Sequence, residues 1–203
     1  MSEVLYAPSR ERVVTTNAWA FLHWLRFERG VRPGGWAELQ AWSAGAPAAF
    51  AEAIETFAGS GLSPVITSGP GRGRIEALAD GLLFKDLRPG DRLLAVETGE
   101  AEPFARAADE SASVLVAPAE LLSTSAFPRP GRANLAGLRT IIATGSPMSP
   151  EARRRIYTWV KADVMLLAHT GNTYWGNPLD PVLARPPATP AFLTPRPSAR
   201  LPR

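Results

Sequence analysis

The chain's best candidates for chemistry lie in a run rich in glycine and arginine, TSGPGRGR, at residues 67–74. The run follows a short apolar segment, residues 64–67, that is typical of a strand. Backbone N–H groups of a glycine-rich turn can cradle an anion, and arginines add positive charge. An ordinary strand-to-helix turn without a ligand fits equally well, so both interpretations stay open. The phosphate-binding candidates are Ser68, Gly69, Gly71 and Arg74.

Other chemical groups are few. The chain has no cysteine, which excludes disulfides, zinc–thiolate sites and thiol nucleophiles. His23 lies in a tryptophan-rich segment and is predicted to be a core or boundary residue. His169 follows a predicted strand, where the ligand contacts of parallel sheets cluster. Neither histidine has the pattern of a Ser-His-Asp relay, and no carboxylate pair typical of a glycosidase stands out.

Composition predicts a globular protein. The chain has 203 residues, of which 45% are hydrophobic and 20% charged, enough for one domain or one and a half. The net charge is +3, and basic residues do not alternate with aromatic ones as in a nucleic-acid-binding surface. The run Arg153–Arg155 predicts a solvated helix face in preference to a phosphate-binding patch.

No segment has the apolar length of a signal peptide or of a membrane span. We therefore expect a soluble cytoplasmic protein that binds neither membranes nor nucleic acid.

Residues 1–61 are predicted to be all helical. Thr16 is a typical N-cap for a helix over residues 17–29, and Gly30 is typical of its end. Two further helices are expected at residues 36–42 and 47–57, closed by Gly59 and Gly61. Their tryptophan and phenylalanine side chains are expected to form a core.

Residues 62–180 alternate between strand and helix patterns. Strands are expected at residues 64–67, 92–96, 113–116, 140–143 and 164–167, and helices at 75–84, 102–109, 118–123 and 150–160. This alternation predicts an α/β fold, with a helical N-terminal segment followed by a partial, mostly parallel sheet with flanking helices. Residues 181–203 are rich in proline and are expected to form an extended, disordered tail.

Three ordered stretches of the chain, taken together, resemble the acetoacetyl-CoA synthetases of the adenylate-forming acyl-CoA synthetase superfamily. Residues 7–59 resemble the family's N-terminal helices, with a Pro8-Ser9-x-Glu11-Arg12 opening. Residues 87–94, LRPGDRLL, resemble the turn that enters a family strand. The most specific match is TGSPMSPE at residues 144–151 and the segment that continues to residue 167. These stretches cover most of the chain.

The resemblance implies a fold that binds ATP or AMP, an incomplete version of the synthetase N-terminal domain. The loop of Gly145, Ser146 and Pro147 matches the family loop that faces adenine, and Gly171, Asn172 and Thr173 match its second nucleotide motif. The segment from Gly145 to Pro147 also fits an ordinary strand-to-helix turn, with Ser149 as N-cap and Pro150 as the first helical residue. Both interpretations stay open.

The chain also departs from the family pattern. The phosphate loop keeps Thr67, Ser68 and Gly69, but Pro70 removes a backbone donor and the later hydroxyls are absent. Tyr174 stands where the family has the carboxylate that binds Mg²⁺, and a neutral phenol is a weak ligand for a hard cation. Measured against the family pattern, we expect long segments to be missing, including the C-terminal lid with its lysine. These departures argue against bound Mg²⁺ and CoA.

Three hypotheses follow. The chain is a truncated acetoacetyl-CoA synthetase-like homologue, unable to complete adenylation and thioester formation alone, that persists as a nucleotide-binding or structural remnant. Alternatively, it is a non-enzymatic interaction module that pairs with itself, with a full-length synthetase or with another partner through surface that the deletion uncovers. In the third, it keeps partial chemistry and another chain supplies the missing half; Tyr174 argues against this.

Overall fold

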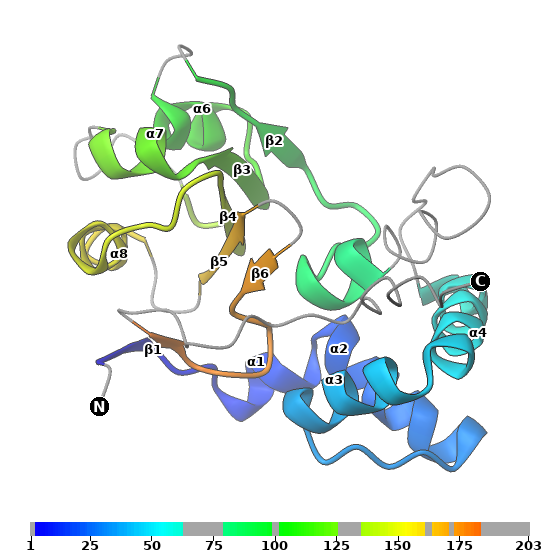
Figure 1. Ribbon diagram of the computed structural model, residues 1–203. Coiled ribbons are helices and arrows are strands. Elements are labelled where there is room, and N and C mark those ends of the chain that lie inside the picture. Colours follow the sequence, from blue (N-terminus) through cyan, green and yellow to red (C-terminus); the bar gives the residue numbers. More distant parts are fainter. Residues whose placement is uncertain are drawn as a thin grey trace, which may run out of the picture.

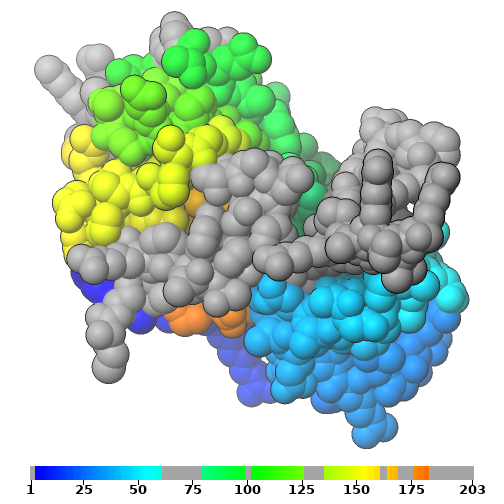
Figure 2. Space-filling model, viewed as in Figure 1, coloured from blue at the N-terminus to red at the C-terminus, as the bar shows by residue number. Residues whose placement is uncertain are grey.

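The computed structural model describes residues 3–62, 79–98, 102–125, 135–160, 164–170 and 173–183. Within these residues, helices of the N-terminal part lie beside a five-stranded sheet whose first four strands are parallel (Figure 1). In Figure 2 the helical part, blue to cyan, and the green and yellow part around the sheet occupy different sides of the molecule. The expected α/β class, with helices preceding a parallel sheet, is confirmed.

The helical region is built from short helices and π-helical turns. They are α1 (Arg10–Val14), α2 (Asn17–Trp24), η1 (Leu25–Arg29), α3 (Trp36–Gly45), α4 (Pro47–Phe57), η2 (Ala58–Leu62) and η3 (Ala79–Phe84). Their apolar faces share one core with several aromatic side chains, among them Phe21, Phe50 and Phe57. This core also includes residues of η3, so it is not confined to residues 1–61.

The boundaries of the first long helix match their local signals. The Thr16 side chain accepts a hydrogen bond from the Trp19 backbone N–H at 3.2 Å, which caps α2. The helical segment continues through η1. It ends at Gly30, whose φ of 66° lies in the left-handed region. The predicted helix over residues 17–29 is therefore confirmed, with its last five residues in π-helical form.

Two expectations for the N-terminal part are wrong. Gly59 and Gly61 do not close the third predicted helix, because the chain continues from α4 into η2. Residues 1–61 are also not all helical, since Val4–Tyr6 form strand β1. This strand pairs in antiparallel fashion with β7 (Val182–Leu183), a partner that local sequence patterns do not reveal.

The main sheet has the strand order β2-β3-β4-β5-β6. Its strands are β2 (Leu93–Ala95), β3 (Val114–Pro118), β4 (Thr140–Thr144), β5 (Met165–Thr170) and β6 (Thr173–Trp175). The first four are parallel neighbours, and β6 returns antiparallel to β5. The strands predicted around residues 92–96, 113–116, 140–143 and 164–167 are thus confirmed, whereas β6 was not predicted. The strand predicted at 64–67 lies outside the described residues.

Helices α6 (Pro103–Asp109), α7 (Ala119–Thr124) and α8 (Pro150–Tyr157) confirm three of the predicted helices. They pack with the sheet in one core, to which Phe104 of α6, Leu122 of α7 and Ile156 of α8 contribute (Figure 1). Alternation along β4 sends Ile141 into this core and Ile142 into a second apolar cluster with Val114, Met165 and Leu167. Both faces of the central strands are therefore buried, as parallel sheets require.

A buried carboxylate joins the helical region to the sheet region. Asp86 is fully buried, and its side chain accepts hydrogen bonds from the Asn17 backbone N–H at 2.8 Å and from Arg88 at 2.7 Å. Arg139, immediately before β4, donates to the same carboxylate at 3.0 Å, and Arg12 of α1 lies 3.7 Å away. Asp86 thus contacts residues from α1, α2 and the start of β4.

The end of the described chain differs from the predicted tail. Val182 is 5% exposed and packs in the core on the α8 side of the sheet, although the sequence suggested an extended, disordered segment from residue 181. The reason is its pairing with β1, whose Tyr6 stacks on Tyr157 of α8 at a ring distance of 6.3 Å. Residues 184–203 lie outside the described residues. Within the described part of the chain, no helix is long and apolar enough to cross a membrane.

Candidate functional site

The carboxyl ends of β4 and β5 form the candidate site, since ligands of open parallel sheets bind at this edge. Thr144, the last residue of β4, lies opposite His169 of β5, and His169 lies opposite Tyr174 of β6. Thr170 is paired with Thr173 across the same hairpin. The sheet therefore brings the Gly145 loop and the strand that carries Thr173 and Tyr174 to the same edge.

The loop after β4 is exposed and its glycine has a special backbone conformation. Gly145 has a φ of 84°, which side chains other than glycine rarely tolerate. A Cβ atom at Gly145 would meet no heavy atom within 4 Å, so the conformation and not crowding explains the glycine. Gly145, Ser146 and Pro147 all lie on the surface.

The loop leads into a well-capped helix. The Ser149 side chain accepts a hydrogen bond from the Ala152 N–H at 3.1 Å, and Pro150 is the first helical residue. The predicted cap and helix start are therefore both confirmed. A hydrogen bond with its own backbone N–H lowers the pKa of Glu151, with smaller contributions from Ser149 and Arg154. The start of α8 thus keeps a negative side chain, which disfavours a phosphate group at this position.

The far end of α8 is tied to the start of β5. Tyr157 donates a hydrogen bond from its hydroxyl to the Val164 carbonyl at 2.7 Å. Burial, and then the neighbouring Tyr6, raise the pKa of Tyr157, so it stays a neutral donor. This contact holds α8 in place and thereby supports the loop that precedes it.

The three arginines of α8 do not share one solvated face, and that expectation is wrong for Arg153. Arg153 is only 4% exposed, and burial lowers its pKa. Arg154 is exposed and pairs with Glu3 at 2.6 Å, while Arg155 donates to the backbone carbonyl of Ser125 at 3.3 Å. Helical geometry rotates adjacent residues by about 100° and so sends them in different directions.

Several predicted site residues lie outside the described residues. They are the phosphate candidates Ser68, Gly69, Gly71 and Arg74, and also Gly171 and Asn172 of the second motif. Thr173 is placed in β6 by its pairing with Thr170. Its role, like that of His169, stays a prediction.

His23 is exposed and not in the core or at its boundary, so that prediction is wrong. Its ring lies 4.6 Å from Trp19 and 6.3 Å from Phe27, and Phe27 is 76% exposed. The three residues are spaced by four along α2 and η1, which puts them on one outer face. They lie in the helical region, apart from the loop after β4.

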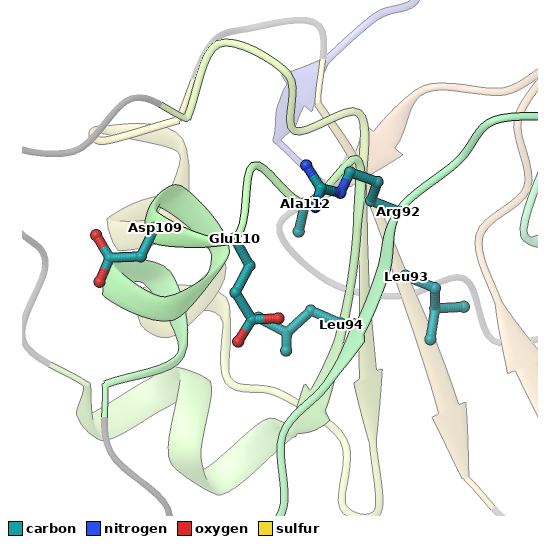
Figure 3. A pocket seen from close by; sticks show the side chains of 6 residues that line it. All are labelled: Arg92, Leu93, Leu94, Asp109, Glu110 and Ala112. Carbon is teal, nitrogen blue, oxygen red and sulfur yellow. The ribbon is translucent and has the colours of Figure 1, made fainter.

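No group of three or more histidine, cysteine or acidic residues that could hold a metal ion occurs within the described segments. Sequence reasoning missed a different feature, a hollow of about 510 Å³ beside β2. Residues from β2 and from the end of α6 line it (Figure 3). The sequence feature that could have drawn attention to this place is the apolar run at residues 93–96, which has Arg92 before it and Glu97 after it.

Comparison with protein-family models, with curated proteins and with solved structures found no match for this chain.

Proposed function

We propose that this chain is a nucleotide-binding, non-catalytic relative of the acetoacetyl-CoA synthetases, which takes ATP or AMP at the carboxyl edge of its sheet. The observation that carries the proposal is the exposed Gly145–Pro147 loop between β4 and α8. In this proposal the chain does not complete adenylation and thioester formation alone, and neither Mg²⁺ nor CoA binds with the nucleotide.

The geometry of the loop suits the adenine end of a nucleotide. A purine base is recognised through backbone donors and acceptors and a flat contact, and both need a backbone that a ligand can approach. Gly145 offers such a backbone because nothing fills the space where a Cβ would stand. Glu151 in the first turn of α8 would repel a phosphate. This favours a nucleotide orientation in which the base, and not the phosphate groups, contacts the loop.

The absence of catalysis is supported by the residue in the place of the metal ligand. Tyr174 lies in β6, paired with His169, beside the edge where the nucleotide would bind. Phosphoryl-type transfer from ATP needs a metal ion to neutralise the charge that develops on the phosphates, and a phenol holds Mg²⁺ poorly. Binding without turnover is the expected behaviour.

Isothermal titration of the full chain with ATP, AMP and CoA, with and without Mg²⁺, tests the proposal. We expect ATP and AMP to release heat, Mg²⁺ to leave their affinities unchanged, and CoA to give no heat. Incubation with ATP and acetoacetate should release no pyrophosphate. Affinity that increases with Mg²⁺, together with pyrophosphate release, would show a working adenylating enzyme instead.

A pair of glycine variants localises the binding. Gly145→Ala should weaken AMP binding about tenfold. Alanine is strained at the φ of 84° that Gly145 adopts, so the loop should change its conformation. Gly90→Ala is the matched control: Gly90 has a φ of 85° and equally open surroundings, but it precedes β2 at the opposite edge of the sheet. Equal affinities for the two variants would place the nucleotide elsewhere. Silent titrations of a folded sample would overturn the proposal and leave the interaction module.

A further inference from the structure

A cluster of charged side chains between the helical region and the sheet carries an excess of positive charge. It consists of the carboxylates of Asp86 and Asp91 and three guanidinium groups that each lie within 3.7 Å of one of them, those of Arg12, Arg88 and Arg139. The first residue of α2 adds a backbone N–H that donates to Asp86 at 2.8 Å. This junction cluster therefore holds one positive charge more than its carboxylates neutralise.

The hydrogen-bond donors that lack an acceptor belong to Arg12 and Arg88. One carboxylate oxygen of Asp86 accepts hydrogen bonds from Arg88 at 2.7 Å and from Arg139 at 3.0 Å, which uses both of its lone pairs. Arg12 lies 3.7 Å from the same oxygen, beyond hydrogen-bond distance. Within the described residues, the Nη2 atom of Arg12 and the Nε atom of Arg88 are buried and have no hydrogen-bond partner.

Buried donors of this kind are rare in folded proteins, and a bound ion or water is a common explanation. Burial lowers the pKa of Arg12, an effect that Asp86 opposes. The like charges of Arg139 and Arg88 add to the lowering, so the charged form of Arg12 lacks stabilisation that an anion would supply. Arg12 keeps 13% of its side chain exposed and Arg88 keeps 28%, so the cluster is open to solvent on their side.

The junction cluster lies at the edge of the sheet opposite the Gly145 loop. Asp91 precedes β2 and Arg139 precedes β4, and both strands run parallel to β3 between them. The amino ends of parallel strands share one edge, whereas Gly145 follows the carboxyl end of β4. A ligand at the cluster is therefore separate from the nucleotide of the proposed function.

We propose that the junction cluster binds a phosphate group between Arg12 and Arg88, which supplies the missing acceptors and neutralises the excess charge. Guanidinium groups hold phosphate through charge-assisted, often paired hydrogen bonds, and a tetrahedral anion accepts from two of them at once. Arg12 belongs to α1 and Arg88 to the segment before β2, so the anion adds a second connection between the helical region and the sheet. Its binding does not depend on the nucleotide.

Titration of the full chain with inorganic phosphate, followed by phosphorus NMR at an ionic strength held constant with sodium chloride, tests the proposal. We expect the phosphate line to broaden in a saturable way. Arg12→Gln should weaken phosphate binding about tenfold, because it removes a charge and the guanidinium donors. Arg26→Gln is the matched control, since it removes the same charge from an exposed position in η1, and it should leave the affinity unchanged.

A variant with the opposite expected effect separates anion binding from a merely structural role of the arginines. Asp86→Asn removes a negative charge beside the phosphate, so it should tighten phosphate binding about tenfold. Phosphate should also restore part of the stability that this variant loses, because it binds the folded chain. The variant keeps the test decisive where Arg12→Gln does not fold.

Three results would overturn the proposal. The first is a phosphate line that stays narrow with the unmodified chain. The second is an equal loss of affinity in Arg12→Gln and Arg26→Gln. The third is a loss of phosphate affinity in Gly145→Ala, which would place the phosphate at the nucleotide loop; we expect this variant to bind phosphate as the unmodified chain does.

Discussion

The helical region and the sheet region of this chain bury their apolar surface in different ways. The helical core relies on aromatic rings that meet edge to face, such as Phe21 with Phe57 at 5.1 Å and with Phe50 at 6.2 Å. The sheet core relies on aliphatic side chains that alternate along parallel strands. Between them lies a polar junction, where Asp86 and Asp91 face several arginines. This contrast suggests that the junction determines whether the two regions unfold as one.

The largest expected effect comes from opening either core. Phe21→Ala and Phe104→Ala each remove a fully buried ring, one from each region, and each should lower the free energy of unfolding by about 3–5 kcal/mol. Urea unfolding should be followed by circular dichroism and by tryptophan fluorescence, which reports mainly on the helical region because four of the six tryptophans lie there. If the regions unfold together, both probes give one midpoint in both variants. A midpoint that moves in one probe only would show independent regions.

Asp86→Asn should come next and should weaken the connection between the regions. The substitution keeps the shape of the side chain and tolerates the φ of 51° at this position, but leaves Arg12, Arg88 and Arg139 without their shared carboxylate. Because one partner of a buried ionic network is lost, the free energy of unfolding should fall by about 3 kcal/mol, and the two probes should separate.

Glu110→Gln is the control for Asp86→Asn, since it removes an exposed i,i+4 pair with Arg106. It should cost less than about 0.5 kcal/mol. Equal effects of the two variants in urea unfolding would show that the Asp86 network adds little beyond a surface ion pair.

The helix caps of the two regions offer a finer comparison. Thr16→Ala removes the cap of α2 and Ser149→Ala the cap of α8, and each should cost about 1 kcal/mol of unfolding free energy. We expect the larger loss at Thr16, which is 1% exposed and also donates to the Val13 carbonyl at 2.7 Å. Chemical denaturation of both variants measures the difference, and a larger loss at the exposed Ser149 would contradict this reasoning.

The smallest expected effect is a pH dependence at the junction. Burial opposes ionisation of Asp91, but hydrogen bonds from Arg139, Arg88 and Ser113 outweigh it and lower the pKa of Asp91 below its ordinary value of 3.8. The unfolded chain therefore takes up a proton first as the pH falls below 3.8, and stability declines from there until the folded pKa is passed. Unfolding free energies measured across this range should fall less steeply for Asp91→Asn than for the unmodified chain. Equal slopes for the two proteins would contradict this reasoning.

Elements with local signals were predictable from the chain alone. Thr16 and Gly30 mark the ends of the helical segment of α2 and η1, and Ser149 with Pro150 marks the start of α8, because caps and left-handed turns involve residues only a few positions apart. The alternation of apolar strands and helices predicted a mostly parallel sheet, and β2 to β5 are parallel neighbours; their order across the sheet came from the structure. In the candidate site, the loop from Gly145 to Pro147 and its position after β4 were predictable for the same reason.

The remaining features depend on residues far apart in the sequence, and only the tertiary structure decided them. Strand β1 finds its partner β7 almost 180 residues later, which no local pattern can indicate. Arg153 is buried while Arg154 is exposed, because packing against the sheet decides which side of α8 is covered. Short-range backbone preferences in the sequence determined the helices and the four parallel strands β2 to β5, but not β1 or β6. The fold determined which charges meet at Asp86, because long-range packing brings α1, α2 and β4 to one buried point.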